Sequence, residues 1–181
     1  MAKTSTHSPA HRAAWSGLET GDHDADIGIL GVPFDGAVSY RRGTSFAPAK
    51  MREMTPHMAA CAQEGQPLEV RVKDYGDVSP DLEWSRYFRE VESRAARVLH
   101  HPLSVFLGGD HSVTHPILRA VGRERPVGCI HIDAHCDTSG EFEGAKFQHG
   151  APFRHAVLEG FHIREGTGAG ILCEQGSMAI H

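Results

Sequence analysis

The sequence predicts an α/β protein with a parallel sheet that is covered by helices on both faces. Short apolar segments alternate with segments of helical periodicity, and brief turns rich in glycine or proline separate them. Most of the apolar segments lack the alternation of polar and apolar residues that marks a half-exposed strand, so both faces of these strands should be buried. We find no internal repeat and expect a single domain.

The first part of the chain supplies two strands and two helices. Residues 26–32 form an apolar run, which Pro33 ends, and this run predicts a buried strand. A helix is expected over residues 49–58. Residues 69–74 alternate by two and predict a more exposed strand. The clearest helix spans residues 82–101, where apolar side chains recur at helical spacing: Trp84, Phe88, Val91, Ala95, Val98 and Leu99.

The second part continues the alternation. Residues 103–107 and 127–132 are apolar runs that predict two further buried strands, and residues 112–121 between them predict a short helix. Proline at the first position favours a helix over residues 152–158. Residues 177–181 have the character of another strand.

Composition excludes some classes of function. The chain has 181 residues and a net charge of −5 without a basic stripe, so nucleic acid is not an expected partner. No apolar stretch reaches the roughly 18 residues of a membrane span, so no membrane association is expected. The four cysteines form no CxxC pair, which predicts reduced thiols and a cytoplasmic location. We expect Cys136 to serve packing.

The N-terminal residues are polar and rich in serine, threonine and histidine. They lack the apolar core of a secretory signal. We therefore assign residues 1–25 to a mobile arm, which could serve subunit contacts, and residues 26–181 to the α/β domain.

The most informative motif follows the strand predicted at residues 127–132. Asp133, His135 and Asp137 stand at alternate positions, and side chains two apart on an extended backbone point the same way. His111 follows the strand at residues 103–107 after a pair of glycines. Two carboxylates with imidazoles suit a divalent ion of the manganese, nickel or zinc group.

Two simpler interpretations compete with a metal site. The alternating acidic segment could be the solvated face of an antiparallel strand, and His111 could be a residue at a helix start. Both segments, however, follow apolar strands, and open α/β sheets bind ligands at the ends of their strands. This position favours the metal site.

These motifs resemble those of the ureohydrolase family, which includes agmatinase, arginase and related guanidino hydrolases. The resemblance runs from Gly31 to the end of the chain. It is carried by the segments GVPFDG at residues 31–36, GGDHS at 108–112 and HIDAHCD at 131–137. The segments YRRG at 40–43 and DYGD at 74–77 are similar to the agmatinase branch.

The resemblance implies a three-layer, arginase-like fold and a centre of two Mn2+ ions, with Ni2+ as an alternative. It implies that His111 and His135 each bind one ion, that Asp133 bridges the pair, and that Asp137 completes one ion's shell. It also implies that His149 transfers a proton during catalysis. Without the resemblance, His149 would be interpreted as a loop or helix-capping residue. The ligating histidines also need hydrogen-bond acceptors, for which Asp110 and Glu141 are candidates.

One feature of the family is missing. Ureohydrolases carry a later acidic motif, Asp-x-Asp-x-x-Asp-Pro, that supplies further metal ligands, and they are longer than this chain. We therefore expect a truncated domain, the N-terminal part of such an enzyme. With four ligands for two ions, the chain alone should bind metal weakly and turn over little substrate.

The expected reaction is hydrolysis of a guanidino C–N bond, which releases urea and an amine. Paired ions can lower the pKa of a shared water, and a histidine can protonate the leaving amine. The substrate is expected to be small and cationic, with agmatine, which yields putrescine in polyamine biosynthesis, favoured. Alternatives are guanidinobutyrate, guanidinopropionate, guanidine, a non-catalytic partner of a full-length homologue, or a single-zinc deacetylase-type protein. The resemblance also implies a homo-oligomer, a trimer or a hexamer.

Overall fold

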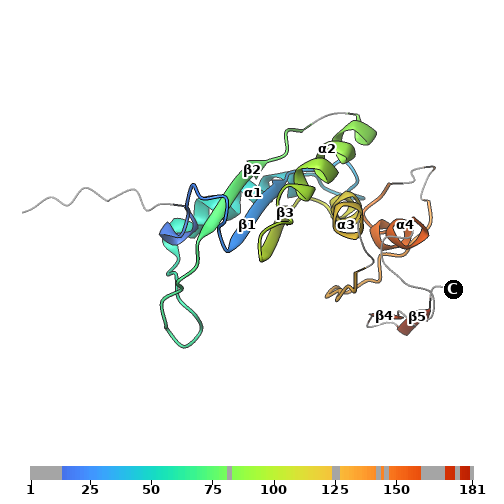
Figure 1. Ribbon diagram of the computed structural model, residues 1–181. Coiled ribbons are helices and arrows are strands. Elements are labelled where there is room, and N and C mark those ends of the chain that lie inside the picture. Colours follow the sequence, from blue (N-terminus) through green and yellow to red (C-terminus); the bar gives the residue numbers. More distant parts are fainter. Residues whose placement is uncertain are drawn as a thin grey trace, which may run out of the picture.

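Among the described residues, three parallel strands form the main sheet, with the order β2–β1–β3 (Figure 1). They are β1 (Ile27–Val32), β2 (Val72–Asp77) and β3 (Leu103–Gly108). The computed structural model describes residues 14–80, 83–123, 127–141, 144 and 147–159, and the backbone of residues 170–173 and 176–179. The apolar run of β1 suits its central position, because both of its neighbours pair with it along almost its whole length.

Helices lie on both faces of this sheet (Figure 1). The α-helices among the described residues are α1 (Ala47–Met54), α2 (Trp84–Ala96), α3 (Thr114–Gly122) and α4 (Pro152–Leu158). Leu30 and Val32 of β1 point to one face and share a buried cluster with residues of α2 and α3. Gly31 points to the other face, where a Cβ would lie 3.1 Å from Pro48 of α1. The predicted α/β class, with helices on both faces of a parallel sheet, is therefore confirmed.

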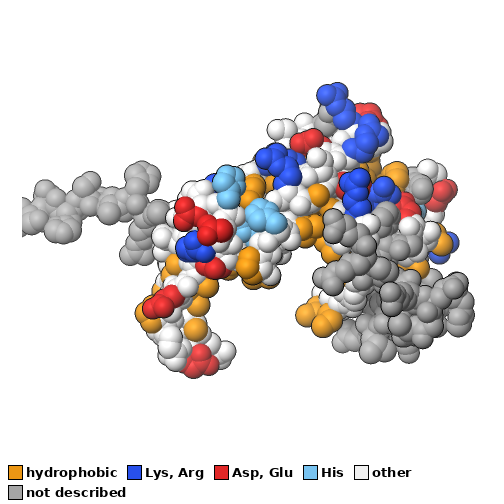
Figure 2. Space-filling model, in the orientation of Figure 1, with side chains coloured by type: hydrophobic (Ala, Val, Ile, Leu, Met, Phe, Trp, Pro, Cys, Tyr) orange, Lys and Arg blue, Asp and Glu red, His pale blue; other side chains and the backbone are white. Residues whose placement is uncertain are grey.

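The amphipathic helix α2 contributes more residues to the main buried cluster than any other element does. Its N-terminus is capped by Glu83, which accepts hydrogen bonds from two backbone N–H groups of the first turn. Its inner face buries Tyr87, Phe88, Val91 and Ala95. Its outer face exposes Arg86 and Arg89, and basic side chains gather over this helix in Figure 2. This division of side chains explains why the helical spacing was visible in the sequence.

Several predicted boundaries shift in the structure. The helix expected at residues 49–58 is α1, followed by the 3-10 helix η3 (Thr55–His57), which begins just before Pro56. The strand expected at residues 177–181 is β5 (Gly176–Ala179), which pairs antiparallel with β4 (Gly170–Cys173) in a separate two-stranded sheet. Among the described residues, no helix has both the length and the apolar content needed to cross a membrane.

The buried strand predicted at residues 127–132 is wrong. This segment forms no strand, and Ile130 and Ile132 are 92% and 93% exposed. A strand needs a neighbour to satisfy its backbone N–H and C=O groups. In the described part of the sheet, β3 pairs with β1 alone, and nothing pairs with residues 127–132.

The predicted arm does not extend over residues 14–25. Leu18 O accepts a hydrogen bond from Val72 N at 2.9 Å, and Thr20 N donates to Val72 O at 2.8 Å. Trp15 packs with Leu18 against the buried cluster of Ile29, Val72 and Leu107. Apolar side chains that the composition of the segment concealed hold these residues to the sheet. Residues 1–13 of the predicted arm lie outside the described residues.

A charged network ties α1, β2 and the N-terminal segment together. Arg52 of α1 binds Asp74 through two hydrogen bonds, with Nε–Oδ2 at 2.7 Å and Nη2–Oδ1 at 2.9 Å. It also donates to Asp77 Oδ1 at 2.5 Å. Trp15 Nε1 donates to Asp74 Oδ2 at 2.7 Å. The side chains of Arg52 and Asp74 are only 20% and 8% exposed, so this ion pair is shielded from water.

The substitution Arg52→Ala is expected to lower the free energy of unfolding by about 3 kcal/mol, because it leaves Asp74 buried without its counter-ion. The matched control is Lys50→Ala on the same helix, where the ion pair with Glu53 is 68% and 62% exposed and should contribute less than about 1 kcal/mol. Urea denaturation measures both values. Equal losses in the two variants would contradict the account.

The same pair predicts a pH dependence. Burial opposes the ionisation of Asp74, but hydrogen bonds from Arg52, Gly76 N–H and Trp15 hold its pKa below the ordinary value of 3.8. Because the pKa of Asp74 is lower in the folded state than in the unfolded state, its ion pair contributes fully to stability at pH values above the unfolded-state pKa. This contribution is lost as the pH falls through the folded-state pKa. The stability difference between the wild type and Arg52→Ala should therefore narrow below a pH of about 4.

Candidate metal centre

The candidate centre lies beyond the carboxyl ends of β1 and β3. Gly109 and Asp110 follow β3, and the 3-10 helix η4 (His111–Val113) begins with His111. The side chain of Asp110 caps η4 through Ser112 N at 2.9 Å and also accepts from Ala37 N, in the loop after β1, at 2.8 Å. Asp110 N in turn donates to Phe34 O at 2.7 Å. These bonds fix the two loops to each other and set the position of His111.

Four side chains bring possible metal-ligating atoms together at this place. They are His111, His131, Asp133 and Asp137, and one such atom from each lies within 4.8 Å of those of the others. His111 Nε2 is 3.0 Å from Asp137 Oδ2. His131 Nε2 is 3.7 Å from Asp133 Oδ2 and 3.8 Å from Asp137 Oδ2. Two imidazoles and two carboxylates form a donor set that suits a divalent transition-metal ion.

The structure thus brings together three of the four ligands expected from the sequence. The fourth, His135, is 77% exposed and lies outside the group, with Nδ1 3.5 Å from Asp133 Oδ1. Its backbone N–H donates to the same oxygen of Asp133 at 3.0 Å. The role of His135 as a ligand stays a prediction.

Sequence reasoning missed His131. The sequence did contain a signal. His131 stands two residues before Asp133, so on an extended backbone its side chain would point the same way as those of Asp133 and Asp137. Its side chain is turned inward and contacts Phe153 of α4, with ring centroids 4.2 Å apart. Phe153 also contacts the ring of His111, at 5.5 Å. This phenylalanine forms an apolar wall of the centre.

The electrostatics of the centre suit metal binding. Burial lowers the pKa of His111, although the carboxylates of Asp137 and Asp133 oppose this shift. The neutral imidazole is the form that binds a metal. The backbone N–H of His135 and the nearby imidazoles lower the pKa of Asp133, which therefore stays ionised near neutral pH. Near neutral pH, the imidazole of His111 and the carboxylate of Asp133 are therefore in the forms that bind a metal, and neither has to lose a proton first.

Backbone conformation also distinguishes Asp137. Its φ of 48° lies in the left-handed region, which non-glycine residues rarely adopt and which aspartate tolerates better than most. Such conformations cluster at functional sites, where the surrounding structure enforces them. Here the conformation accompanies a side chain that is only 10% exposed and directed at His111.

The hydrogen-bond partner of His111 is Thr114, another residue that sequence reasoning missed. His111 Nδ1 and Thr114 Oγ1 lie 2.9 Å apart. When Nδ1–H donates to this hydroxyl, the lone pair of Nε2 faces the carboxylates and is free to bind a metal. The two candidate acceptors proposed from the sequence do not take this role among the described contacts: Asp110 caps η4, and Glu141 lies exposed.

The substitution Thr114→Val should therefore weaken the binding of Mn2+ by about tenfold, because it removes the acceptor and keeps the shape of the side chain. Isothermal titration calorimetry measures the affinity. Thr138→Val is a suitable control, because Thr138 is a buried threonine of the same region whose hydroxyl donates to Cys136 Sγ at 3.4 Å. An unchanged affinity in Thr114→Val would contradict the assigned role.

His149, the predicted proton-transfer residue, lies in the loop before α4. Its Nδ1 is 2.7 Å from Ala37 O, so the loop after β1 orients both His149 and, through Asp110, His111. Ser139 N donates to Gly150 O at 2.9 Å, and a Cβ on Gly150 would lie 3.9 Å from Asp137 Oδ1. The loop that carries His149 therefore lies beside Asp137. His149 is not among the four clustered residues.

Fold and site together define an α/β protein with helices on both faces of a parallel sheet and a candidate metal centre at the carboxyl ends of its strands. The family model described as "Arginase family" matches residues 25–171, which is most of the chain. This protein belongs to the arginase family.

Curated relatives and solved structures support this assignment. The guanidinopropionase of Pseudomonas aeruginosa is 43% identical over 146 residues, which cover 74% of this chain and 44% of that protein. The mitochondrial agmatinase of Gallus gallus is 38% identical over 151 residues, with coverage of 79% and 44%. Among solved structures, Trypanosoma cruzi formiminoglutamase with Mn2+ has a TM-score of 0.66 and 26% identity, and the match covers 76% of this chain and 49% of that one. The chain spans about half the length of these relatives.

Proposed function

We propose that this chain provides the metal-binding part of an enzyme that hydrolyses the guanidino C–N bond of a linear guanidino compound, releasing urea and an amine. The observation that carries the proposal is the convergence of His111, Asp133 and Asp137 in a chain of the arginase family. The similar Trypanosoma cruzi formiminoglutamase, whose structure was solved with Mn2+, supports manganese as the ion, with Ni2+ as the alternative.

The chemistry needs a strong nucleophile, because resonance and positive charge make the guanidinium carbon a poor electrophile. A bound divalent ion lowers the pKa of water and so supplies hydroxide near neutral pH. His111, Asp133 and Asp137 would hold the first ion, and His135 remains the predicted ligand of a second.

His149 is suited to the second half of the reaction. After water adds to the guanidinium carbon, the C–N bond to the alkyl nitrogen breaks, and the departing amine must gain a proton. An imidazole, whose ordinary pKa is about 6.5, can deliver that proton near neutral pH. The bond from Nδ1 to Ala37 O leaves Nε2 free for the transfer.

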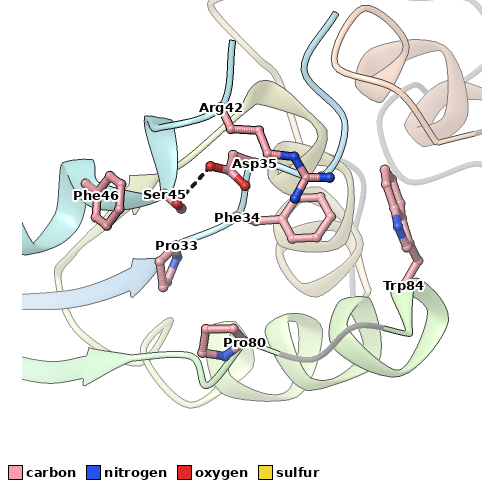
Figure 3. Close-up of a pocket in the computed structure, with 9 residues that line it drawn as sticks. Pro33, Phe34, Asp35, Arg42, Ser45, Phe46, Pro80 and Trp84 are labelled. Atoms are coloured by element: carbon pink, nitrogen blue, oxygen red, sulfur yellow. Dashed lines mark hydrogen bonds between the residues drawn. The ribbon is translucent and has the colours of Figure 1, made fainter.

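A pocket beside the centre supports a second candidate substrate class. The sequence favours agmatine, but an open pocket of about 390 Å³ is lined by Phe34, Arg42, Phe46 and Trp84 (Figure 3). The guanidinium of Arg42 is directed toward the rings of Phe34 and Trp84, and no hydrogen bond or ion pair engages it among the described contacts. Asp35 in the same pocket already accepts hydrogen bonds through its carboxylate, from Gly43 N at 2.8 Å and from Ser45 Oγ at 2.9 Å.

An unpaired guanidinium suits the carboxylate of a guanidino acid and opposes the ammonium group of agmatine. The pocket adjoins the centre, because Phe34 O accepts from Asp110 N, one residue before His111. The name of the guanidinopropionase from Pseudomonas aeruginosa agrees with this class of substrate. An ω-guanidino acid is therefore the favoured alternative to agmatine.

In a chimera in which this chain replaces the corresponding part of the guanidinopropionase from Pseudomonas aeruginosa, Arg42→Ala should lower kcat/KM for guanidinopropionate or guanidinobutyrate by about tenfold to a hundredfold, which corresponds to the loss of a charged hydrogen bond. The value for agmatine should stay the same or rise. The control is Arg41→Ala, because Arg41 stacks on the exposed ring of Tyr40, 5.0 Å from its centroid. If agmatine is the better substrate, and Arg42→Ala changes kcat/KM equally for agmatine and for the guanidino acids, a guanidino acid is excluded as the preferred substrate.

A chimera tests the reaction class directly. The matched residues of this chain would replace the corresponding part of the guanidinopropionase from Pseudomonas aeruginosa, and urea release would be followed with Mn2+ and a panel of guanidino compounds. We expect urea from the chimera and little or none from the 181-residue chain alone. A folded, metal-loaded chimera that releases no urea from any compound would overturn the proposal. Assembly into a trimer or hexamer and a cytoplasmic location stay predictions.

A further inference from the structure

A network of charged side chains joins the end of α4 to α2 and α3. Glu159, the residue that ends α4, presents its Oε2 atom to two side chains of α3. Arg119 Nη1 donates to this oxygen, and His115 Nε2 lies 3.1 Å from it. Arg119 Nε also donates to Glu92 Oε2 of α2, at 2.9 Å. We call these four residues, Glu92, His115, Arg119 and Glu159, the Glu159 network; none of them belongs to the candidate metal centre.

The position of Glu159 at the end of α4 depends on its partners. A carboxylate at the C-terminus of a helix lies near the last backbone carbonyl groups, whose partial negative charge disfavours it. Burial also opposes the ionisation of Glu159, but His115 and Arg119 hold its pKa below the ordinary value of 4.5. Glu159 is therefore charged near neutral pH, and the two side chains of α3 fix it in place.

The Glu159 network is shielded from water. The side chain of His115 is only 5% exposed, and those of Glu92 and Glu159 are mostly buried. The ring of His115 stacks on Phe147, with centroids 5.6 Å apart, and Phe147 contacts Phe88 of the main buried cluster at 5.5 Å. Shielded ion pairs are coupled more strongly than exposed pairs, many of which contribute nothing measurable. Breaking this network should therefore move the end of α4 and not merely release a side chain.

Helix α4 connects this network to the metal centre. It lies beside α3 (Figure 1), and among the described elements α3 and η4 are its main neighbours. At its start, Phe153 packs against the rings of His111 and His131, with centroids 5.5 and 4.2 Å away. The loop before it carries His149. Because a helix of seven residues rises only about 10 Å and moves as a unit, the Glu159 network also fixes the start of α4 and this loop.

We propose that Glu159 is a positioning residue: it fixes α4 against α3 through Arg119 and His115, and α4 in turn holds His149 where it can protonate the leaving amine. The role in catalysis rests on the proposed function, whereas the placement of His149 does not. Among the described contacts, Glu159 touches no residue of the metal centre, so it acts only through the helix.

NMR of the metal-free 181-residue chain tests the placement of His149. Long-range proton–nitrogen correlation spectra at a pH of about 8, where imidazoles are neutral, distinguish the two tautomers. The bond to Ala37 O should hold the proton of His149 on Nδ1, and His149→Gln assigns the signal. Glu159→Gln removes the charge and keeps the size of the side chain. In this variant we expect the Nδ1–H form to fall from the dominant tautomer to a minority.

Two further variants guard against a general loss of folding. Glu53→Gln, in the exposed ion pair of α1, should leave the tautomer of His149 unchanged. The double variant Arg119→Gln with Glu159→Gln leaves neither member of the α3–α4 ion pair charged, and it should change His149 as Glu159→Gln does. A wild-type tautomer of His149 in both Glu159 variants would overturn the proposal. Loss of the helical amide signals of α4 in both would also overturn it, because Glu159 would then stabilise the helix and not position it.

A double-mutant cycle in the chimera with the guanidinopropionase tests the catalytic role. Glu159→Gln and Arg119→Gln should each lower kcat about tenfold and leave KM within about twofold, because a small misplacement of a catalytic group slows the chemical step. The double variant should resemble either single variant, since the two residues act as one unit. Losses that multiply to about a hundredfold, or a rise in KM alone, would overturn the catalytic role. A chimera that releases no urea would overturn the proposed function, and the NMR result would still decide the placement of His149.

Discussion

Asp137→Asn is expected to weaken the binding of Mn2+ at least about a hundredfold, the largest functional effect of a single substitution that we predict. Asp137 is the carboxylate nearest to His111 Nε2, at 3.0 Å, and it lies 3.8 Å from His131 Nε2. Asparagine keeps the size of the side chain and tolerates the left-handed backbone at φ 48°. The substitution therefore removes the negative charge while the conformation of the loop is preserved.

Isothermal titration calorimetry with Mn2+ measures this change. The control is Asp24→Asn, because that carboxylate is 83% exposed and lies near Arg71, away from the centre. It should leave the affinity unchanged. A loss of less than about threefold in Asp137→Asn, with the control unchanged, would show that Asp137 is not a ligand.

Gly109→Ala is expected to have the largest effect on stability. A Cβ at this position would lie 1.9 Å from Phe34 O and 2.6 Å from Phe34 N, which are backbone atoms that cannot turn aside. The loop after β1 would have to move, and the hydrogen bond from Asp110 N to Phe34 O would be lost. We expect a loss of about 3 kcal/mol or more, and a fall in Tm of roughly 6–12 °C. Because Asp110 precedes His111, the affinity for Mn2+ should fall as well.

Gly140→Ala is the matched control, because a Cβ there meets nothing within 4 Å and the residue has no positive φ. Its free energy of unfolding should stay within about 0.5 kcal/mol of the wild type. Differential scanning calorimetry in the absence of metal separates the structural effect from the binding effect. A Gly109→Ala chain that unfolds at the wild-type temperature would contradict the close approach of the two loops.

The features that the sequence predicted correctly are those set by local pattern. The apolar run of β1 and the helical spacing of Phe88, Val91 and Ala95 are properties of adjacent residues, and both elements form where expected. The sequence also predicted that His111 and Asp137 meet, and they lie 3.0 Å apart, although the strand that was expected to carry Asp137 to this place does not form.

The features that could not be predicted depend on neighbours in space. Residues 127–132 have the composition of a strand, but a strand forms only beside another, and no described segment pairs with them. Without the pleat of a sheet, the segment turns His131 inward and leaves His135 exposed. The hydrogen bond between Thr114 and His111 likewise depends on how η4 continues into α3, which residue types alone do not fix.

Anomalous diffraction from crystals of this chain grown with Mn2+ tests the central claim most directly, namely that imidazole and carboxylate groups from separate loops share a metal ion. The account predicts a manganese peak within coordination distance of both His111 Nε2 and Asp137 Oδ2. A peak bound by only one of these two residues, or a map in which their side chains lie apart with no peak between them, would contradict it.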